Sequence, residues 1–403
     1  MNRFRAVYCR IFQQAFHLAI PFLPYRQPEI FYSTSKLPPL FEKKHIRKVM
    51  VITDPGVRSL GLIDRMLMHM DHHDISYVIY DKTVANPTNE QVEEAKELYL
   101  AEGCEALIGF GGGSSMDCAK AVGARLARPK KSLKQMAGIL KVRKKLPLLI
   151  AIPTTAGTGS ETTLAAVITD AQTRYKYAIN DFPLIPRYAV LDPKTTLSLP
   201  PMLTATTGLD ALTHAVEAYI GGSTTPKTRK YARKAVKLIF ENLQTAVQDG
   251  QNAEARKHML EAAYYAGCAF TVSYVGYVHA IAHSLGGKYN VPHGLANAVL
   301  LPTVLEAYGD SVWKKLSQLA VEAGLVEKGT DEQEAAERFI EAIKAMKQEF
   351  GIGDTFEQIR LEDIPEMARH AEHEANPLYP VPVLWNAKEL ERLYLAVMES
   401  KEE

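Results

Sequence analysis

The chain is poor in cysteine and balanced in charge, and both features exclude classes of protein. Among 403 residues there are four cysteines, none in a Cys-x-x-Cys pair: Cys9, Cys104, Cys118 and Cys268. This pattern favours free thiols in a reducing compartment, which predicts a cytoplasmic location. The 47 basic and 46 acidic residues leave a net charge of +1, which points away from nucleic acid and from an anionic membrane as partners.

Long apolar runs are also missing. No stretch approaches the roughly 20 apolar residues that a transmembrane helix needs, so the sequence predicts no membrane span. The extension at 1–28 begins with three arginines and an apolar run, loosely like a signal peptide, but Gln13, Gln14 and His17 interrupt that run and no small-residue cleavage site follows. We interpret the extension as an amphipathic helix docked on the protein or on a partner subunit. A helix lying on a membrane surface is the alternative.

The pattern of apolar residues along the chain changes near Pro200-Pro201, which predicts two domains of different structural classes. Before this point, short apolar runs alternate with helical periodicity, the pattern of a parallel sheet covered on both faces; after it, helical stretches follow one another without a convincing strand. We therefore expect an α/β domain at 29–200 and an all-helical domain at 201–403. The expected strands are 49–53, 76–80, 106–110, 148–152 and 188–191, and the expected long helices are 203–220, 228–247, 253–272, 279–288, 310–323, 332–350 and 387–399.

A glycine-rich turn, Gly111-Gly112-Gly113, follows the strand expected at 106–110 and opens a helix. Glycines let a ligand approach the backbone, and a helix N-terminus offers free N–H groups and a partial positive charge to a phosphate. The turn is therefore a candidate phosphate site. The alternative is an ordinary strand–helix turn with Ser114 or Ser115 as the N-cap.

The usual dinucleotide fingerprint is missing from this turn. The pattern G-x-G-x-x-G cannot be fitted to it, and no acidic residue lies between Arg128 and Pro147, where a ribose-binding carboxylate is expected. Asp54, at the end of an earlier strand, is available for that role instead.

A second polar turn, Pro153–Thr162, follows the strand expected at 148–152. Its hydroxyls and glycines gather at the carboxyl end of a parallel strand, where open α/β sheets bind their ligands. The alternative is a cluster of helix caps at Ser160 and Thr162. Two such turns on adjacent strand–helix units favour a bound nucleotide.

Histidines and an aspartate recur at metal-ligand spacing in the helical region. Asp210 and His214 lie four residues apart, His279 and His283 repeat that spacing on another helix, and His293 follows. Side chains four apart share one helix face, and one carboxylate with several imidazoles suits Fe(II), Zn(II), Mn(II) or Co(II). The spacing does not decide which of the three later histidines bind. The alternative is a set of histidines hydrogen-bonded within a core.

The segments at 111–120, 153–161, 210–219 and 279–294 closely resemble the iron-containing (group III) alcohol dehydrogenase family, in its order and spacing. The resemblance extends over about residues 29–400. It implies the dehydroquinate synthase-like/iron-alcohol-dehydrogenase fold, with an N-terminal dinucleotide-binding domain, a C-terminal all-helical domain and an active site in the cleft between them. The N-terminal extension departs from the usual start of the family.

The resemblance also implies roles for single residues. The metal ligands would be Asp210, His214, His279 and His293, whereas His283 would lie near the nicotinamide and the substrate and act in proton transfer. The implied cofactor contacts are Asp54, Asn86, Gly112, Gly113, Ser114, Asp117, Thr154, Thr155 and Lys176. The carboxylate of Asp54 would accept hydrogen bonds from the ribose hydroxyls and repel a 2′-phosphate, which favours NAD over NADP.

The activity implied is reversible oxidation of a primary alcohol to an aldehyde by NAD, with Fe(II) as the metal, or Zn(II), in a homodimer or higher homo-oligomer. A zinc-dependent polyol or glycerol dehydrogenase is the nearest alternative. A metal phosphohydrolase is a more distant alternative, because it would be expected to have adjacent His-Asp ligands, which the cluster lacks. A non-catalytic nucleotide-binding protein is another, because such a protein would often have lost a ligand, whereas all four ligand positions are present here. The stretch Phe270–Tyr277 would line a variable pocket, so the identity of the substrate does not transfer.

Overall fold

The computed structural model describes residues 3–173 and 175–399. The chain divides into two compact units. One, here called the α/β unit, spans Pro24–Leu199, and the other, the helical unit, joins the chain up to Leu23 to the chain from Pro200 onward.

The α/β unit is built on a six-stranded sheet in the order β1-β9-β6-β4-β2-β3, in which every neighbouring pair is parallel. The strands are β1 (Glu29–Phe31), β2 (Lys48–Ile52), β3 (Ser76–Tyr80), β4 (Ala106–Gly111), β6 (Leu148–Pro153) and β9 (Tyr188–Val190). The carboxyl ends of β4 and β6, which carry the two polar turns, are neighbours in this sheet.

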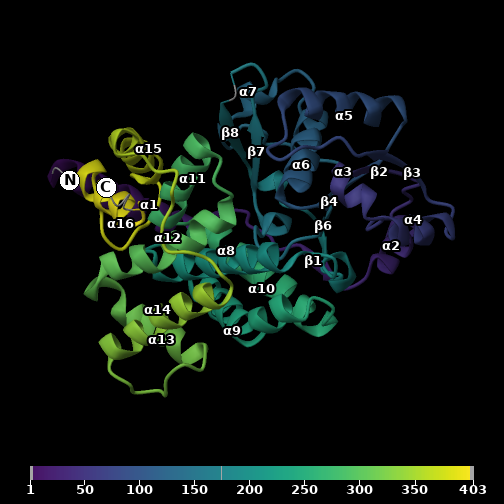
Figure 1. The fold of residues 1–403 in the computed structure, drawn as a ribbon. Coiled ribbons are helices and arrows are strands. Elements are labelled where there is room, and N and C mark those ends of the chain that lie inside the picture. Colours follow the sequence, from purple (N-terminus) through teal and green to yellow (C-terminus); the bar gives the residue numbers. More distant parts are fainter. Residues whose placement is uncertain (1–2, 174, 400–403) are drawn as a thin grey trace. The chain divides into compact units, whose positions relative to one another are not determined.

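Alternation along β2 shows why helices cover both faces of the sheet. Met50 and Ile52 belong to one buried apolar cluster, and Val49 and Val51 to the other. Successive side chains of a strand point to opposite faces, so an all-apolar strand requires cover on both sides. Residues of α5 (Asn89–Ala101) and α6 (Gly113–Ala127) complete the first cluster, and residues of α2 (Leu37–Lys43) and α4 (Asp64–Asp71) the second (Figure 1).

A smaller sheet of three strands accompanies the main one. In it, β8 (Lys176–Asn180) pairs antiparallel with β7 (Ala165–Thr169) and parallel with β5 (Gly138–Ile139). Two short helices, α3 (Pro55–Ser59) and α7 (Leu133–Met136), complete the unit.

The helical unit consists of α1 and the helices from α8 onward. Their bounds are α1 (Arg3–Ala19), α8 (Pro201–Ile220), α9 (Pro226–Gln248), α10 (Ala253–Ser273), α11 (Tyr277–Tyr289), α12 (His293–Tyr308), α13 (Asp310–Glu322), α14 (Glu332–Glu349), α15 (Ile364–Ala375) and α16 (Ala387–Ala396). Among the described residues, none of the helices is both long enough and apolar enough to cross a membrane.

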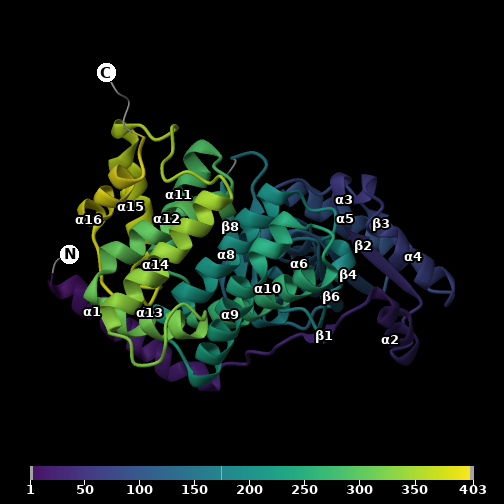
Figure 2. The ribbon, with the colours of Figure 1, turned by 60° about the horizontal axis from the view of Figure 1, so that its bottom comes forward.

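Helix α8 forms the centre of this unit. Every residue from Gly208 to Ile220 is buried, as expected for a helix that neighbours surround. It packs against α12 on one side and against the α9–α10 pair on the other (Figure 2). Polar side chains on α8 are therefore held inside the unit, away from bulk water.

The predicted fold class is confirmed, and the differences lie in particular elements. The five expected strands and seven expected helices each have a counterpart within a few residues. The sequence did not predict α12, which contains Pro302, nor the three-stranded sheet. Pro302 lies inside α12, where a proline has no N–H to donate to the carbonyl four residues earlier.

Candidate metal and cofactor sites

Two candidate metal ligands come from α8. Asp210 and His214 lie one turn apart on its buried face, with 2% and 4% of their surfaces exposed. The ring of Phe270, on α10, stacks on the His214 imidazole with the ring centroids 4.1 Å apart. Burial and this stacking hold the imidazole in one orientation.

The other two come from the starts of α11 and α12. His279 lies in the first turn of α11, and His293 is the first residue of α12, directly after Pro292. The next residue, Gly294, lets α12 approach α8 closely, because a Cβ there would lie 2.6 Å from the carbonyl oxygen of Thr206. Any larger side chain at this glycine would push the histidine away from α8.

These four residues form one cluster. Each offers one ligand atom, and these atoms lie within 4.8 Å of one another. Asp210 Oδ1 is 3.5 Å from His293 Nε2 and 4.0 Å from His279 Nε2. One carboxylate and three imidazoles are a donor set for Fe(II), Zn(II) or a similar divalent ion.

Glu217, which sequence reasoning missed, supports the cluster from behind. Its carboxylate lies 2.6 Å from Nδ1 of His279 and accepts backbone N–H bonds from Gly276 and Val278, each at 2.8 Å. The contact engages Nδ1 and leaves Nε2 of His279 directed at the cluster, as carboxylates behind metal-binding histidines do. Burial, followed by the neighbouring imidazoles, lowers the pKa of His279 well below its ordinary value, which favours the neutral ring that binds metals.

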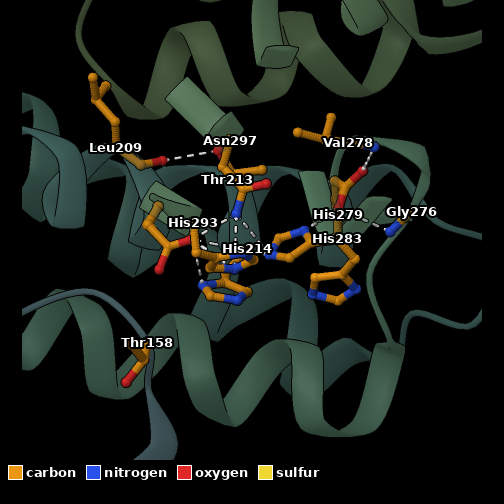
Figure 3. Close-up of polar contacts among 12 residues, drawn as sticks. Thr158, Leu209, Thr213, His214, Gly276, Val278, His279, His283, His293 and Asn297 are labelled. Atoms are coloured by element: carbon orange, nitrogen blue, oxygen red, sulfur yellow. Dashed lines mark hydrogen bonds and ion pairs between the residues drawn. The ribbon is translucent and has the colours of Figure 1, made fainter. Parts of the chain in front are cut away.

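Asn297 is a second residue that the sequence analysis missed. Its amide Nδ2 donates to Asp210 Oδ1 at 2.7 Å and lies 3.2 Å from His279 Nε2 and 3.1 Å from His293 Nε2. Figure 3 shows this amide among the imidazoles of the cluster. The residue is four positions after His293 on α12, the same spacing that singled out the histidines.

His283 lies beside the cluster and does not belong to the group of four. Its ring stacks on His293 with centroids 5.2 Å apart, and its Nδ1 is 2.6 Å from Glu374 Oε1. Burial lowers the pKa of His283, but the facing Glu374 carboxylate outweighs it, and the net shift is upward. The Tyr379 hydroxyl donates to the same carboxylate oxygen at 2.8 Å.

The residues present fit a divalent metal. The four donors converge from three helices, two of them four residues apart on α8, and two side chains outside the set, Glu217 and Asn297, hold donors in place. The alternative was a set of histidines that only form hydrogen bonds within a core. Such a set would not require the donor atoms of four side chains to converge on one point.

The glycine turn of the α/β unit forms a cradle. Gly111 has φ +151°, and a Cβ there would lie 2.5 Å from Ser115 Oγ, so only glycine fits. The following Gly112 is the N-cap of α6 and no side chain caps the helix, which contradicts the alternative with Ser114 or Ser115 as the cap. The N–H groups at the start of α6 are thus left for a ligand.

The second polar turn lies against the first. Thr154 N donates to the Gly111 carbonyl at 3.0 Å. The buried Thr155 Oγ1 has no hydrogen-bond partner among the described residues and lies 3.9 Å from the place that a Cβ on Gly112 would take. A glycine cradle faced by an unpartnered hydroxyl fits a phosphate group.

Two other predicted cofactor contacts, Asp54 and Asn86, lie at this cradle. Asp54 Oδ2 accepts from Ser115 Oγ at 3.2 Å, and Asn86 N donates to Ser114 Oγ at 3.2 Å. Lys176 pairs in register with Thr169, whose N–H donates to the carbonyl of residue 87.

Asp117 lies near the cradle, but its carboxylate is hydrogen-bonded to other residues of the protein. Its two carboxylate oxygens accept bonds from Ser160 Oγ at 2.8 Å and from Val167 N at 3.0 Å. This side chain ties α6 to the second turn and to β7.

The cradle of the α/β unit fits a phosphate-bearing cofactor and the cluster of the helical unit fits a divalent metal, which are the parts expected of a cofactor-dependent enzyme. Comparison with known families gives the particular one. The model for "Iron-containing alcohol dehydrogenase" matches residues 30–193, and the model for "Fe-containing alcohol dehydrogenase family, C-terminal" matches residues 204–398. The chain therefore belongs to the iron-containing alcohol dehydrogenase family, which confirms the resemblance of its motifs, and it is an alcohol/aldehyde oxidoreductase.

Individual relatives agree with this assignment. Alcohol dehydrogenase 4 of Saccharomyces cerevisiae is 39% identical over 83% of this chain and 87% of its own length. NAD-dependent methanol dehydrogenase of Bacillus methanolicus is 37% identical over 81% of this chain and 86% of its own. A solved structure of 1,3-propanediol oxidoreductase superposes with a TM-score of 0.89 at 35% identity, covering 93% of this chain and 99% of that one.

Proposed function

We propose that this protein transfers hydride reversibly between a primary alcohol, or its aldehyde, and NAD, at a site where Asp210, His214, His279 and His293 hold Fe(II). The observation that carries the proposal is the convergence of these four donors within 4.8 Å of one another. Two relatives support the substrate class, since methanol and 1,3-propanediol, which their names contain, are primary alcohols.

The bound metal would supply a Lewis acid for the alcohol or aldehyde oxygen. The protein's own contribution is to keep the donors ready. Glu217 fixes the orientation of His279, and Asn297 orients the carboxylate of Asp210 by its 2.7 Å bond. Three imidazoles with one carboxylate also suit Zn(II), and the iron in the family name favours Fe(II).

For the cofactor, the cradle at Gly112, Gly113 and Ser114 would receive the pyrophosphate of NAD, with Thr155 Oγ1 as an additional donor. Asp54, at the edge of the cradle, would accept ribose hydroxyls and repel the 2′-phosphate of NADP. The name of the Bacillus methanolicus relative contains the same cofactor preference.

His283 would handle the proton that alcohol oxidation releases. Its Nδ1 is engaged with Glu374, so Nε2 is the atom available to hold or release a proton. The Glu374 carboxylate raises the pKa of this imidazole against the opposing effect of burial, which strengthens its hold on a proton.

Two further features of the proposal do not depend on this site. The four cysteines are buried and none of them forms a disulfide, which supports a cytoplasmic enzyme. A homodimer or higher homo-oligomer remains our prediction, and light scattering of the purified protein would measure it.

The test is an absorbance assay of NADH with a panel of primary alcohols and aldehydes, run with NAD and NADP in parallel on protein purified without oxygen. We expect turnover with at least one primary alcohol and a clear preference for NAD. Protein that contains stoichiometric metal and binds NADH, yet turns over no alcohol or aldehyde of the panel, would refute the proposal.

A further inference from the structure

The N-terminal helix α1 lies outside the part of the chain that the family models match, which begins at residue 30. It is nevertheless hydrogen-bonded to the C-terminal part of the helical unit. The buried Gln13 donates from Nε2 to the carbonyl oxygens of Pro377 and Tyr379, at 3.2 and 2.7 Å. The Arg10 guanidinium donates to the carbonyls of Val381 and Pro382, each at 2.7 Å.

These four bonds hold one loop, here called the 377–382 loop. They add to the backbone bonds of the loop, in which Val381 N donates to the Tyr379 carbonyl and Gly222 N to the Pro380 carbonyl, and they reach four of its six carbonyl groups. Arg5, one turn earlier on α1, forms an ion pair of 2.6 Å with Glu372 in the helix that precedes the loop. Side chains of α1 therefore contribute to the position of the loop.

The loop carries Tyr379, and through it α1 is connected to the candidate site. The Tyr379 hydroxyl donates to Glu374 Oε1, and the same oxygen contacts Nδ1 of His283. The ring of His283 in turn stacks on the candidate ligand His293. Two hydrogen bonds and one ring contact thus separate the loop from the metal cluster.

A second route leads from α1 to the same place. Phe16 packs edge-on against Tyr274, with ring centroids 5.2 Å apart. Tyr274 lies one helical turn after Phe270, which stacks on the candidate ligand His214, and its ring is 6.4 Å from that of Tyr379.

Tyr274 also has an unusual backbone. Its φ of +62° is uncommon for a bulky residue, and such a conformation persists where the surroundings enforce it. The edge contact from Phe16 is one of those surroundings. The rings of the two tyrosines are 6.4 Å apart, and α1 contacts both residues, Tyr274 through Phe16 and Tyr379 through Gln13.

We propose that α1 is a specificity element of this enzyme, in which Gln13 and Phe16 are positioning residues that fix Tyr379 and Tyr274 as a wall beside the reacting alcohol. The inference rests on the proposed function, since it requires the alcohol to react at the cluster. Loosening the wall should admit longer and bulkier alcohols relative to short ones.

The test compares Gln13→Leu with Gln14→Leu. Gln14 is the neighbouring residue on α1, is exposed, and serves as a control of identical chemistry. We measure kcat and KM for straight-chain primary alcohols of increasing length and for a branched one. Because Gln13→Leu removes two side-chain hydrogen bonds from the loop, we expect KM for the shortest alcohol to rise by about tenfold with a smaller change in kcat.

The expected signature is a change in selectivity. The ratio of kcat/KM for the longest alcohol to that for the shortest should rise at least about fivefold in Gln13→Leu and stay constant in Gln14→Leu. Phe16→Ala acts through Tyr274 instead of the loop and should shift the ratio in the same direction, so the test stands even if Gln13→Leu folds poorly.

Hydrogen exchange of the backbone amides of Leu378, Tyr379 and Val381, the residues of the loop that are not proline, provides a readout that needs no turnover. Faster exchange in Gln13→Leu, together with the altered selectivity, supports the inference. Faster exchange in Gln13→Leu, with selectivity unaltered in both Gln13→Leu and Phe16→Ala, would show that α1 only stabilises the loop. That result would overturn the inference. A wild-type protein that is inactive towards every alcohol would overturn the proposed function and this inference together, whereas an active wild type with unmoved ratios overturns the inference alone.

Discussion

Glu217 Oε2 lies 2.6 Å from Nδ1 of His279, and this contact decides which nitrogen of the ring faces the candidate metal cluster. The carboxylate is buried and also holds two backbone N–H groups at the start of α11. It therefore couples the orientation of one candidate ligand to the position of the helix that carries it.

This contact predicts that a conservative substitution of Glu217 strongly weakens metal binding. Glu217→Gln preserves the size of the side chain but removes its charge, and it leaves the His279 ring without a carboxylate partner. We expect metal affinity to fall by about 10- to 100-fold, as substitutions behind metal ligands generally do. Competition with a chelator measures it, and Glu254→Gln, at an exposed position on α10, is the control. Equal affinity in the two variants would contradict the role given to Glu217.

Asn297 should matter most when the metal is removed. Its amide is a hydrogen-bond donor to the buried carboxylate of Asp210. We expect Asn297→Ala to destabilise the metal-free protein by about 1.5–3 kcal/mol, the range for a lost bond to a charged group. Asn297→Asp should destabilise it further, because two carboxylates would then share one buried site. Thermal melting with and without added Fe(II) or Zn(II) tests this: the metal should restore more stability to Asn297→Asp than to Asn297→Ala, and the reverse order would argue against the arrangement.

Asp54 can be tested without disturbing the helix that it caps. Its Oδ1 accepts from Val57 N at 3.0 Å at the start of α3, a role that serine also fills. Asp54→Ser removes the negative charge and keeps the cap. We expect the ratio of kcat/KM with NADP to that with NAD to rise by about tenfold or more, because the repulsion of the 2′-phosphate is lost. Ser115→Ala removes the hydroxyl beside Asp54 but not the charge, and it should leave the ratio unchanged.

Glu161 predicts a pH dependence of stability in the α/β unit. Burial is the main cause that raises the pKa of this carboxyl to about 7, and its Oε1 has no partner among the described residues. The folded state therefore holds the proton more tightly than the unfolded state. The stability that the group contributes is complete below pH 4.5 and is lost as the pH rises towards 7 and beyond, by about 3 kcal/mol in all.

Glu161→Gln should remove this dependence. The variant and the wild type should melt alike near pH 4.5, while above pH 7 the variant should be the more stable of the two. Calorimetry across this range, with the exposed Glu97→Gln as the control, provides the measurement. A difference between variant and wild type that does not change with pH would show that the carboxyl titrates normally.

The parts of the fold that could be predicted from the sequence are those with a regular local spacing of apolar residues. The apolar runs of β2, β4 and β6 and the helical spacing of α8 need no distant partner to be recognised. Helix α12 was missed because a proline such as Pro302 argues against a helix in the sequence, and because most of its residues are buried, so it has no polar face to mark the helical period. The two-residue strand β5 is too short to leave a pattern.

The candidate site divides in the same way. Asp210 and His214 were found because both lie on one helix face at a spacing that reads as a motif. Glu217 also lies on α8, but its significance comes from His279, 62 positions later, and only the folded chain brings the two together. The bonds from Gln13 to the 377–382 loop span more than 360 positions, so no local pattern announces them.

The central claim is that Asp210, His214, His279 and His293 hold the catalytic metal while His283 stands outside it. Elemental analysis of protein purified without oxygen, paired with the NADH assay, tests this most directly on wild type, His279→Ala and His283→Ala. We predict about one metal ion per chain in the wild type and in His283→Ala, with slower turnover in the latter, and loss of both metal and activity in His279→Ala. A metal-free His279→Ala that still oxidises alcohols, or a His283→Ala that loses its metal, would contradict the account.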